Sequence, residues 1–234
     1  MKIKVIIPNS GMPRETLDAR EAMLSRAVSP DTGISVDCIP EGPVSIESNT
    51  DEVLAAPLLL RMGRQAEREG YEALVVYCFS DLAVDALREQ LRIPVTGPGE
   101  TALAAADMLS NRFTVITTTG GNISRTRRRL LKNHVCREKM TSVRALDIPV
   151  ADLREDPDAT RRYLEQVCLQ AMEEEGIDTV VLGCLGMAQY GGAIEEKTGL
   201  RVIDPAFLAV AWAELAARLG LRHGPRSYAP REGL

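Results

Sequence analysis

Two cysteines occupy matching places in the sequence, and their surroundings favour a reactive thiol. Cys78 ends the apolar run ALVVYC and Cys184 ends TVVLGC, and a helix-like segment follows each of them. A Glu-Gly pair precedes each cysteine at the same distance, Glu69-Gly70 and Glu175-Gly176. A cysteine at a strand-to-helix turn lies near free backbone N–H groups and the positive end of a helix dipole. Both features favour the thiolate, which is the nucleophilic and basic form of cysteine.

Two thiols that face each other across a cleft suit one kind of reaction. One thiolate removes a proton from a carbon next to a carbonyl, and the other thiol delivers a proton to the opposite face, so the stereocentre inverts. The backbone N–H groups of Phe79-Ser80 and Leu185-Gly186 are candidates to hold the enolate oxygen. We find no motif for a metal or for pyridoxal, and the reaction needs neither. A redox disulfide between Cys78 and Cys184 is the alternative use of the pair.

Strand-like runs alternate with helix-like segments along the chain, which is typical of parallel sheets with helices on their faces. The expected strands are residues 2–8, 34–40, 72–78, 93–98, 112–119, 142–150, 178–184 and 200–205. The expected helices are residues 16–27, 49–70, 81–90, 100–109, 123–134, 158–175, 187–198 and 207–219. We expect Asn49, Thr50 or Asp51 to cap the second helix, and Ser80 and Asp81 to cap the third.

The two halves of the chain repeat each other at a spacing of about 106 to 110 residues. IKVIIPNS matches FTVITTTG, EREGYEALVVYC matches EEEGIDTVVLGC, and IPVTGP matches LRVIDP. The sequence therefore predicts an α/β fold of two pseudo-symmetric lobes, residues 1–98 and 99–205, with the active site in the cleft between them. We expect residues 206–222 to pack back on the first lobe and residues 223–234 to form a poorly ordered tail.

The composition of the chain argues against several classes of protein. The net charge of -5 argues against nucleic acid as the main partner. The start MKIKVIIPNS lacks an apolar signal-peptide core, and no apolar run reaches the roughly 18 residues that a membrane span needs. The cysteine count is odd, no CxxC occurs, and the two histidines have no zinc-site spacing. We expect a cytoplasmic homo-oligomer with free thiols that acts on a small molecule, without metal or cofactor.

Several other polar features have two interpretations. Asn9 follows the first strand and is either a donor to substrate oxygens or part of an Asx-turn. The turn TTTGG, residues 117–121, could cradle a phosphate, but it lacks the GxxxxGK[ST] pattern of nucleotide sites. The basic segment 124–134 has no interleaved aromatic residues, which favours a solvated helix face or a subunit contact over an RNA site. We interpret Cys38, Cys136 and Cys168 as small buried apolar residues, and His134 and His223 as surface residues.

Six motifs carry a resemblance to a known family: IIPNS (6–10), GPVSIES (42–48), CFSD (78–81), GPGETA (97–102), TTTGG (117–121) and LGCLGMA (182–188). With them the chain resembles the aspartate/glutamate/hydantoin racemase superfamily over nearly its whole length, most closely the hydantoin and allantoin racemase branch. The resemblance implies two Rossmann-like lobes, and Cys78 and Cys184 as the acid/base pair. It also implies substrate contacts from Asn9, Ser10, Ser45, Ile46, Phe79, Ser80, Thr117, Thr118, Thr119, Leu185 and Gly186.

The leading hypothesis is thus an isomerase, a cofactor-independent racemase that acts on a 5-substituted hydantoin or on allantoin. The two cysteines favour racemisation over the decarboxylation carried out by single-cysteine relatives. Three alternatives stay open: an aspartate/glutamate-type amino-acid racemase, an enzyme similar to maleate cis–trans isomerase, and a non-catalytic small-molecule sensor on a two-lobed scaffold.

Overall fold

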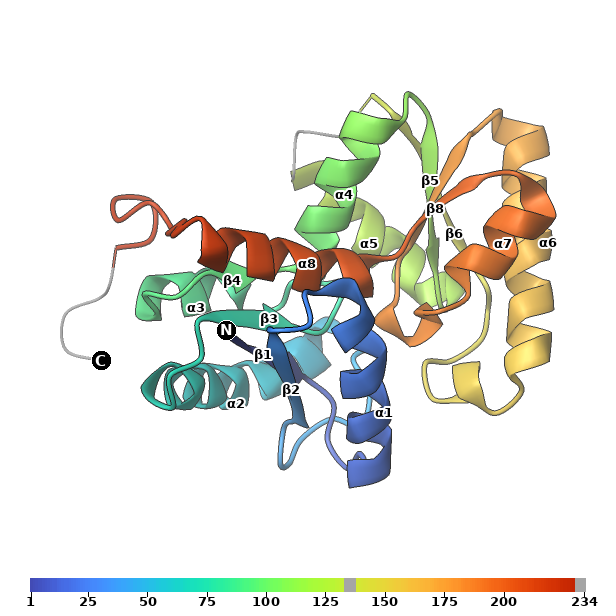
Figure 1. Cartoon of the computed structure of the whole chain (residues 1–234). Coiled ribbons are helices and arrows are strands. Elements are labelled where there is room, and N and C mark those ends of the chain that lie inside the picture. Colours follow the sequence, from blue (N-terminus) through green and yellow to red (C-terminus); the bar gives the residue numbers. More distant parts are fainter. Residues whose placement is uncertain (133–137, 230–234) are drawn as a thin grey trace. The chain divides into compact units, whose positions relative to one another are not determined.

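The computed structural model describes residues 1–132 and 138–229, and these residues divide into two compact units. The first unit comprises Met1–Pro98 together with the chain from Ala206 onward, and the second comprises Gly99–Pro205. Each unit contains one four-stranded sheet with helices on its faces (Figure 1). The predicted fold class, α/β with two lobes built on parallel sheets, is confirmed.

The first unit is built on the strand order β2-β1-β3-β4, and all neighbouring strands are parallel. Its strands are β1 (Lys2–Ile7), β2 (Gly33–Cys38), β3 (Ala73–Val76) and β4 (Val95–Thr96). Its helices are α1 (Arg14–Leu24), a 3-10 turn η1 (Ser25–Ala27), α2 (Asn49–Arg68), α3 (Val84–Gln90) and α8 (Pro205–Arg218). Strand β3 is wholly apolar and buried, and β1 is apolar and buried apart from the exposed Lys2 and the buried Lys4, because helices cover both faces of the sheet.

The second unit repeats this plan with the strand order β6-β5-β7-β8, again parallel throughout. Its strands are β5 (Phe113–Thr117), β6 (Met140–Ala145), β7 (Thr179–Leu182) and β8 (Arg201–Ile203). Its helical segments are α4 (Pro98–Leu109), α5 (Gly120–Lys132), η3 (Asp152–Arg154), α6 (Pro157–Glu175), η4 (Leu185–Met187) and α7 (Gly191–Thr198). Each strand therefore has its counterpart at the same place in the other sheet.

The two units exchange their last helices. Helix α4 follows β4 of the first sheet but belongs to the second unit, where Lys139 and Asp107 form an ion pair of 3.3 Å. Helix α8 follows β8 of the second sheet but belongs to the first unit. There the buried carboxylate of Glu214 accepts hydrogen bonds from the Ser29 backbone N–H at 3.1 Å and from the Thr32 hydroxyl. Burial would raise the pKa of Glu214, but these hydrogen bonds lower it overall, so the anion is well held.

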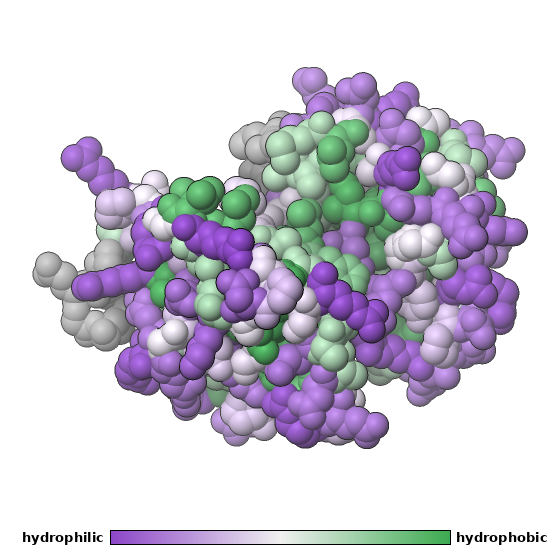
Figure 2. Space-filling view, in the orientation of Figure 1, coloured by the Kyte–Doolittle hydropathy of each residue, from purple (hydrophilic) through white to green (hydrophobic). Residues whose placement is uncertain are grey.

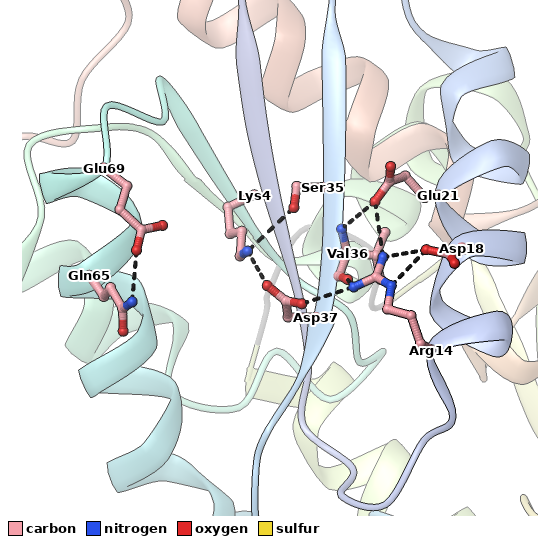
Figure 3. Close-up of polar contacts among 9 residues, drawn as sticks. All are labelled: Lys4, Arg14, Asp18, Glu21, Ser35, Val36, Asp37, Gln65 and Glu69. Carbon is pink, nitrogen blue, oxygen red and sulfur yellow. Dashed lines mark hydrogen bonds and ion pairs between the residues drawn. The ribbon is translucent and has the colours of Figure 1, made fainter.

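Each sheet carries a polar cluster at the equivalent strand position. In the first unit the nearly buried Lys4 bonds Ser35 Oγ at 3.4 Å and pairs with Asp37, which also pairs with Arg14 (Figure 3). Arg14 in turn pairs with Asp18 one helical turn along α1 at 2.6 Å (Figure 3). These contacts join β1, β2 and α1 by polar interactions. A strand with only apolar side chains would be held there by packing alone.

The equivalent cluster of the second unit is centred on Glu175, the last residue of α6. Its carboxylate accepts hydrogen bonds from Thr114 Oγ1 and Thr141 Oγ1, both at 2.6 Å, from Ser142 Oγ at 2.8 Å and from Arg144 Nε at 2.7 Å. Burial alone would raise the pKa of Glu175, but these four partners outweigh it and lower the pKa to about 2. The cluster fastens α6 to β5 and β6.

Several element boundaries differ from the sequence-based expectation. Helix α2 is capped by Ser48, whose side chain and that of Asp51 form a reciprocal capping box, so the expected cap at Asn49, Thr50 or Asp51 is wrong. The expected helix 187–198 is split into η4 and α7. Helix α5 begins at Gly120, earlier than expected, and residues 133–134 of that prediction, including His134, lie outside the described residues.

On the face shown in Figure 2 the surface is mainly hydrophilic, with hydrophobic areas over the C-terminal part of α8 and over part of the second unit. Trp212, Leu215 and Leu219 of this helix are 45%, 44% and 65% exposed. Within residues 1–132 and 138–229, no helix combines the length and apolar character that crossing a bilayer requires. Beyond α8, His223 and Tyr228 make defined contacts with α3 and β4, in contrast to the poorly ordered tail that we expected.

Candidate active site

Cys78 lies in a turn directly beyond β3, two residues after the last residue that pairs with β1. Its side chain is half-buried, and its Sγ lies 3.3 Å from the hydroxyl of Ser80. The turn is closed by the backbone N–H of Asp81, which donates to the Cys78 carbonyl at 3.1 Å. Phe79 and Ser80 are buried, so the sulfur is held in a packed turn rather than on a loose loop.

The turn after Cys78 has an uncommon backbone. Asp81 and Ala83 have φ values of 52° and 58°, in the left-handed region that residues other than glycine seldom adopt. Gly97, directly after β4, makes room for this turn, because a Cβ there would lie 2.6 Å from Asp81 Cγ. Helix α3 starts only at Val84 and has no side-chain cap. The expected caps Ser80 and Asp81 are therefore wrong, and Cys78 does not stand directly at the start of a helix as we expected.

Cys184 lies at the equivalent point of the second unit, two residues beyond the last pairing of β7 with β5. It is the extended N-cap of η4, and its half-buried Sγ accepts a hydrogen bond from the Gly186 backbone N–H at 3.4 Å. A side chain at Gly186 would come within 2.8 Å of Leu153, and one at Gly183 within 2.7 Å of the Ile116 carbonyl oxygen. The glycines on both sides of Cys184 thus allow close packing that no other residue permits.

Asn9 and Ser10 follow β1, which neighbours β3, and they hold the loop of residues 42–46. Asn9 Nδ2 donates to the Val44 carbonyl at 3.1 Å. The Ser10 hydroxyl donates to the Gly42 carbonyl at 2.8 Å. In this loop Ser45 is half-buried, and Ile46 is buried in the cluster against which Cys78 packs. The Asn9 amide thus has a clear structural role in addition to the substrate contact that the resemblance implies.

Thr117, Thr118 and Thr119 occupy the corresponding place in the second unit, at the end of β5. Thr117 and Thr118 are buried, and Thr119 is half-buried. The Gly120 backbone N–H donates to Asp147 Oδ1 at 2.7 Å, so this turn already has an anion from its own chain. That contact argues against the phosphate interpretation of TTTGG.

Asn122 and Asp147 were not predicted from the sequence, although both form hydrogen bonds with this turn. The buried Asn122 donates from Nδ2 to the Thr118 hydroxyl at 3.0 Å, and its Oδ1 accepts from Arg125 at 2.8 Å. Asp147 has a left-handed φ of 58°. Asn122 could have been noticed as a polar residue in the first turn of a helix after a strand; Asp147 gave no signal, because it stood inside an expected strand.

The structure therefore gathers the predicted residues in one set per unit. In the first unit, Asn9, Ser10, Ser45, Ile46, Cys78, Phe79 and Ser80 lie at and beyond the carboxyl ends of β1 and β3 or in the attached loop. In the second unit, Thr117, Thr118, Thr119, Cys184, Leu185 and Gly186 lie at and beyond the ends of β5 and β7. Each cysteine packs against the hydrophobic core on one side of its own sheet.

The remaining cysteines separate clearly from these two. Cys168 is fully buried, and burial together with Glu165 raises its pKa to about 12, which makes it inert. Cys38 is half-buried at the end of β2, so its interpretation as a buried apolar residue is wrong, and Cys136 lies outside the described residues. Among the described residues, the thiols of Cys38, Cys78, Cys168 and Cys184 form no disulfide with one another. Within that same part, no three His, Cys, Asp or Glu side chains are grouped to hold a metal ion.

Comparison with known proteins identifies the family. Residues 3–213 match the family model described as Asp/Glu/Hydantoin racemase. The chain is 34% identical to a hydantoin racemase of Pseudomonas sp. (strain NS671), over 94% of this chain and 87% of that protein. It is also 34% identical to a hydantoin racemase of Rhizobium meliloti, over 92% and 88%. The structure of allantoin racemase from Klebsiella pneumoniae superposes with a TM-score of 0.92 at 28% identity, covering 100% of this chain and 95% of that one. The chain belongs to the Asp/Glu/hydantoin racemase family.

Proposed function

We propose that this protein is a cofactor-independent racemase that inverts the carbon next to a carbonyl in a 5-substituted hydantoin or in allantoin. The observation that carries the proposal is the placement of Cys78 and Cys184 two residues beyond equivalent strands, β3 and β7. Membership of the racemase family supports the reaction, and the relatives named hydantoin racemase and allantoin racemase support the substrate class.

In the proposed mechanism one sulfur is a thiolate and the other a thiol. The thiolate takes the proton from the substrate carbon, the C–H electron pair moves into the adjacent carbonyl, and an enolate forms. The thiol then gives its proton to the opposite face of the same carbon. The substrate is inverted, and the protonation states of Cys78 and Cys184 have exchanged. The opposite enantiomer runs the same steps with the roles of the two cysteines reversed.

The other residues of the two sets bind and orient the substrate in this proposal. Backbone N–H groups and hydroxyls suit the ring oxygens of a ureide, since fixed donors stabilise an enolate oxygen better than mobile water does. The substrate-binding residues that we propose are Asn9, Ser10, Ser45, Ile46, Phe79, Ser80, Thr117, Thr118, Thr119, Leu185 and Gly186.

Two further properties belong to the proposal. We place the protein in the cytoplasm, since free half-buried thiols suit a reducing compartment. We also expect a homo-oligomer, and the exposed apolar side chains of α8 support this expectation because such patches commonly mark interfaces. Light scattering on the purified protein measures the mass directly, and a monomer at all concentrations would contradict the second point.

The test of function is optical rotation together with proton NMR in D2O on EDTA-treated protein. The substrates are both enantiomers of several 5-substituted hydantoins and of allantoin. We expect loss of rotation, with deuterium appearing at the carbon between carbonyl and nitrogen at the same time. Exchange no faster than the spontaneous rate on every one of them would reject the proposal. Aspartate, glutamate and maleate then test the amino-acid racemase and isomerase alternatives.

A further inference from the structure

Strand β4 is a two-residue edge strand with β3 as its neighbour in the sheet. The backbone groups of Val95 that point away from β3 are nevertheless paired. The Val95 N–H donates to Nε2 of His223 at 2.8 Å. The Val95 carbonyl accepts from Nε and Nη2 of Arg88 at 3.2 and 3.1 Å. An unpaired edge strand can fray or pair with the wrong partner. These side chains bond the free edge of β4 as a fifth strand of the sheet would.

The side chains that complete the edge also hold one another. The Arg88 guanidinium lies over the Tyr228 ring, 5.5 Å from its centroid, and Nη1 donates to the Tyr228 hydroxyl at 3.4 Å. The rings of His223 and Tyr228 meet edge to face at 5.5 Å. Arg88 is almost buried beneath this cover. We call His223, Tyr228, Arg88 and Val95 the tail lock, because it joins the segment after α8 to β4 and α3.

The tail lock is connected to the Cys78 turn through Gly97 and Asp81. Gly97 follows β4 directly, and the Asp81 carboxyl fills the space where a Cβ of Gly97 would be. Asp81 is left-handed and closes the turn on the Cys78 carbonyl. Backbone conformations of this kind persist only when their surroundings impose them. Gly97 is part of that surrounding, and its position is set by β4.

We propose that His223 is a positioning residue for Cys78: by fixing Val95 it fixes Gly97, which holds Asp81 and the turn that carries the sulfur. The proposal takes the catalytic role of Cys78 from the proposed function, but the positioning itself does not depend on that function. His223 acts as a hydrogen-bond acceptor at Nε2, so a side-chain amide oxygen can replace it and a methyl group cannot.

The test compares His223→Ala, His223→Gln and the matched control Arg226→Ala, an exposed residue of the same tail. Iodoacetamide alkylation of Cys78, Cys184 and Cys168 is followed peptide by peptide with mass spectrometry, beside kcat and KM. With His223→Ala we expect faster labelling of the half-buried Cys78 as its turn loosens, by about fivefold for one lost hydrogen bond, and a fall of kcat by a similar factor. Labelling of Cys184 stays unchanged, and His223→Gln restores both values.

Cys168 distinguishes positioning from general loss of stability. It is fully buried, so faster labelling of Cys168 together with Cys78 reports unfolding and would overturn the proposal, as would an unchanged Cys78 rate in His223→Ala. If His223→Ala does not fold, Arg88→Lys removes the paired hydrogen bonds to the Val95 carbonyl and carries the same expectation. A wild-type protein without racemase activity, but with the expected labelling changes, would reject the proposed function and leave the positioning role standing.

Discussion

The backbone N–H of Gly186 donates to the sulfur of Cys184 at 3.4 Å, whereas the sulfur of Cys78 has the hydroxyl of Ser80 as its neighbour at 3.3 Å. An N–H group can only donate, so it stabilises a thiolate, while a hydroxyl can also accept the proton of a thiol. The pseudo-symmetry of the fold therefore does not extend to these two contacts of the sulfurs.

This asymmetry predicts the order in which the two thiols react. At neutral pH and without substrate, iodoacetamide should label Cys184 faster than Cys78, because the Gly186 N–H stabilises the nucleophilic thiolate form of Cys184. Limited alkylation followed by peptide mass spectrometry gives both rates in one experiment, with Cys168 as the unreactive reference. Faster labelling of Cys78 would show that the Ser80 hydroxyl stabilises its thiolate more effectively than Gly186 stabilises that of Cys184.

Replacement of either proposed catalytic thiol should abolish racemisation. We expect Cys78→Ser and Cys184→Ser each to lower kcat/KM by at least about a hundredfold, because a serine hydroxyl is a poor acid and base at neutral pH. A single mutant that retains one thiolate can still exchange the proton of one enantiomer without inverting it, which NMR in D2O detects. Cys38→Ser is the matched control and should be unaffected. Full activity in both mutants would remove the two-thiol mechanism.

The space beside Cys184 is another point that mutation can test. In Gly186→Ala the new methyl group meets Leu153 at 2.8 Å, and overpacking of this kind costs about 1–3 kcal/mol. We expect a lower melting temperature and a loss of kcat, as the sulfur and its N–H donor move apart. Gly192→Ala, in α7 with open space around it, is the matched control and should retain both. Wild-type kinetics in Gly186→Ala would show that the turn adapts without moving the sulfur.

The Glu175 cluster predicts a specific loss of stability in acid. Its pKa in the folded protein, about 2, lies below the ordinary value of 4.5, so its stabilising effect is complete above about pH 5 and is lost as the pH falls toward 2. The difference corresponds to an upper limit of about 3–4 kcal/mol, which solvent screening reduces at this partly exposed carboxylate. Urea unfolding between pH 7 and pH 3 should show a weaker pH dependence for Glu175→Gln than for wild type.

Features that depend on periodicity and on repetition could be predicted from the sequence. The alternation of apolar runs and helical segments predicted the eight strands and eight α-helices of the described residues, apart from their boundaries and the 3-10 helices, and the matching Cys78 and Cys184 turns could be located without coordinates. Features that depend on contacts between distant segments could not. We expected Asp81 to be a cap, because nothing in the neighbouring sequence shows that Gly97 makes room for it in a left-handed turn.

The segment after α8 is a second case in which contacts between distant segments could not be predicted from the sequence. HGPRSYAP has the composition of a disordered end, yet His223 and Tyr228 are fixed by Arg88 and by the open edge of β4. The cap of α2 failed for a more local reason. Ser48 stood one residue before the expected helix, and its reciprocal bond with Asp51 decided the boundary.

The exchange of α4 and α8 has a consequence for the history of the chain. In a half-length ancestor with this connectivity, the last helix would not pack on its own sheet. The face of that sheet could be covered only by the last helix of a second, identical copy. The present chain has the connectivity of such a swapped pair fused end to end. Fragment 1–98, which lacks α8, should therefore fail to fold alone, whereas fragment 99–234 contains the whole second unit and should restore the first unit when the two are expressed together.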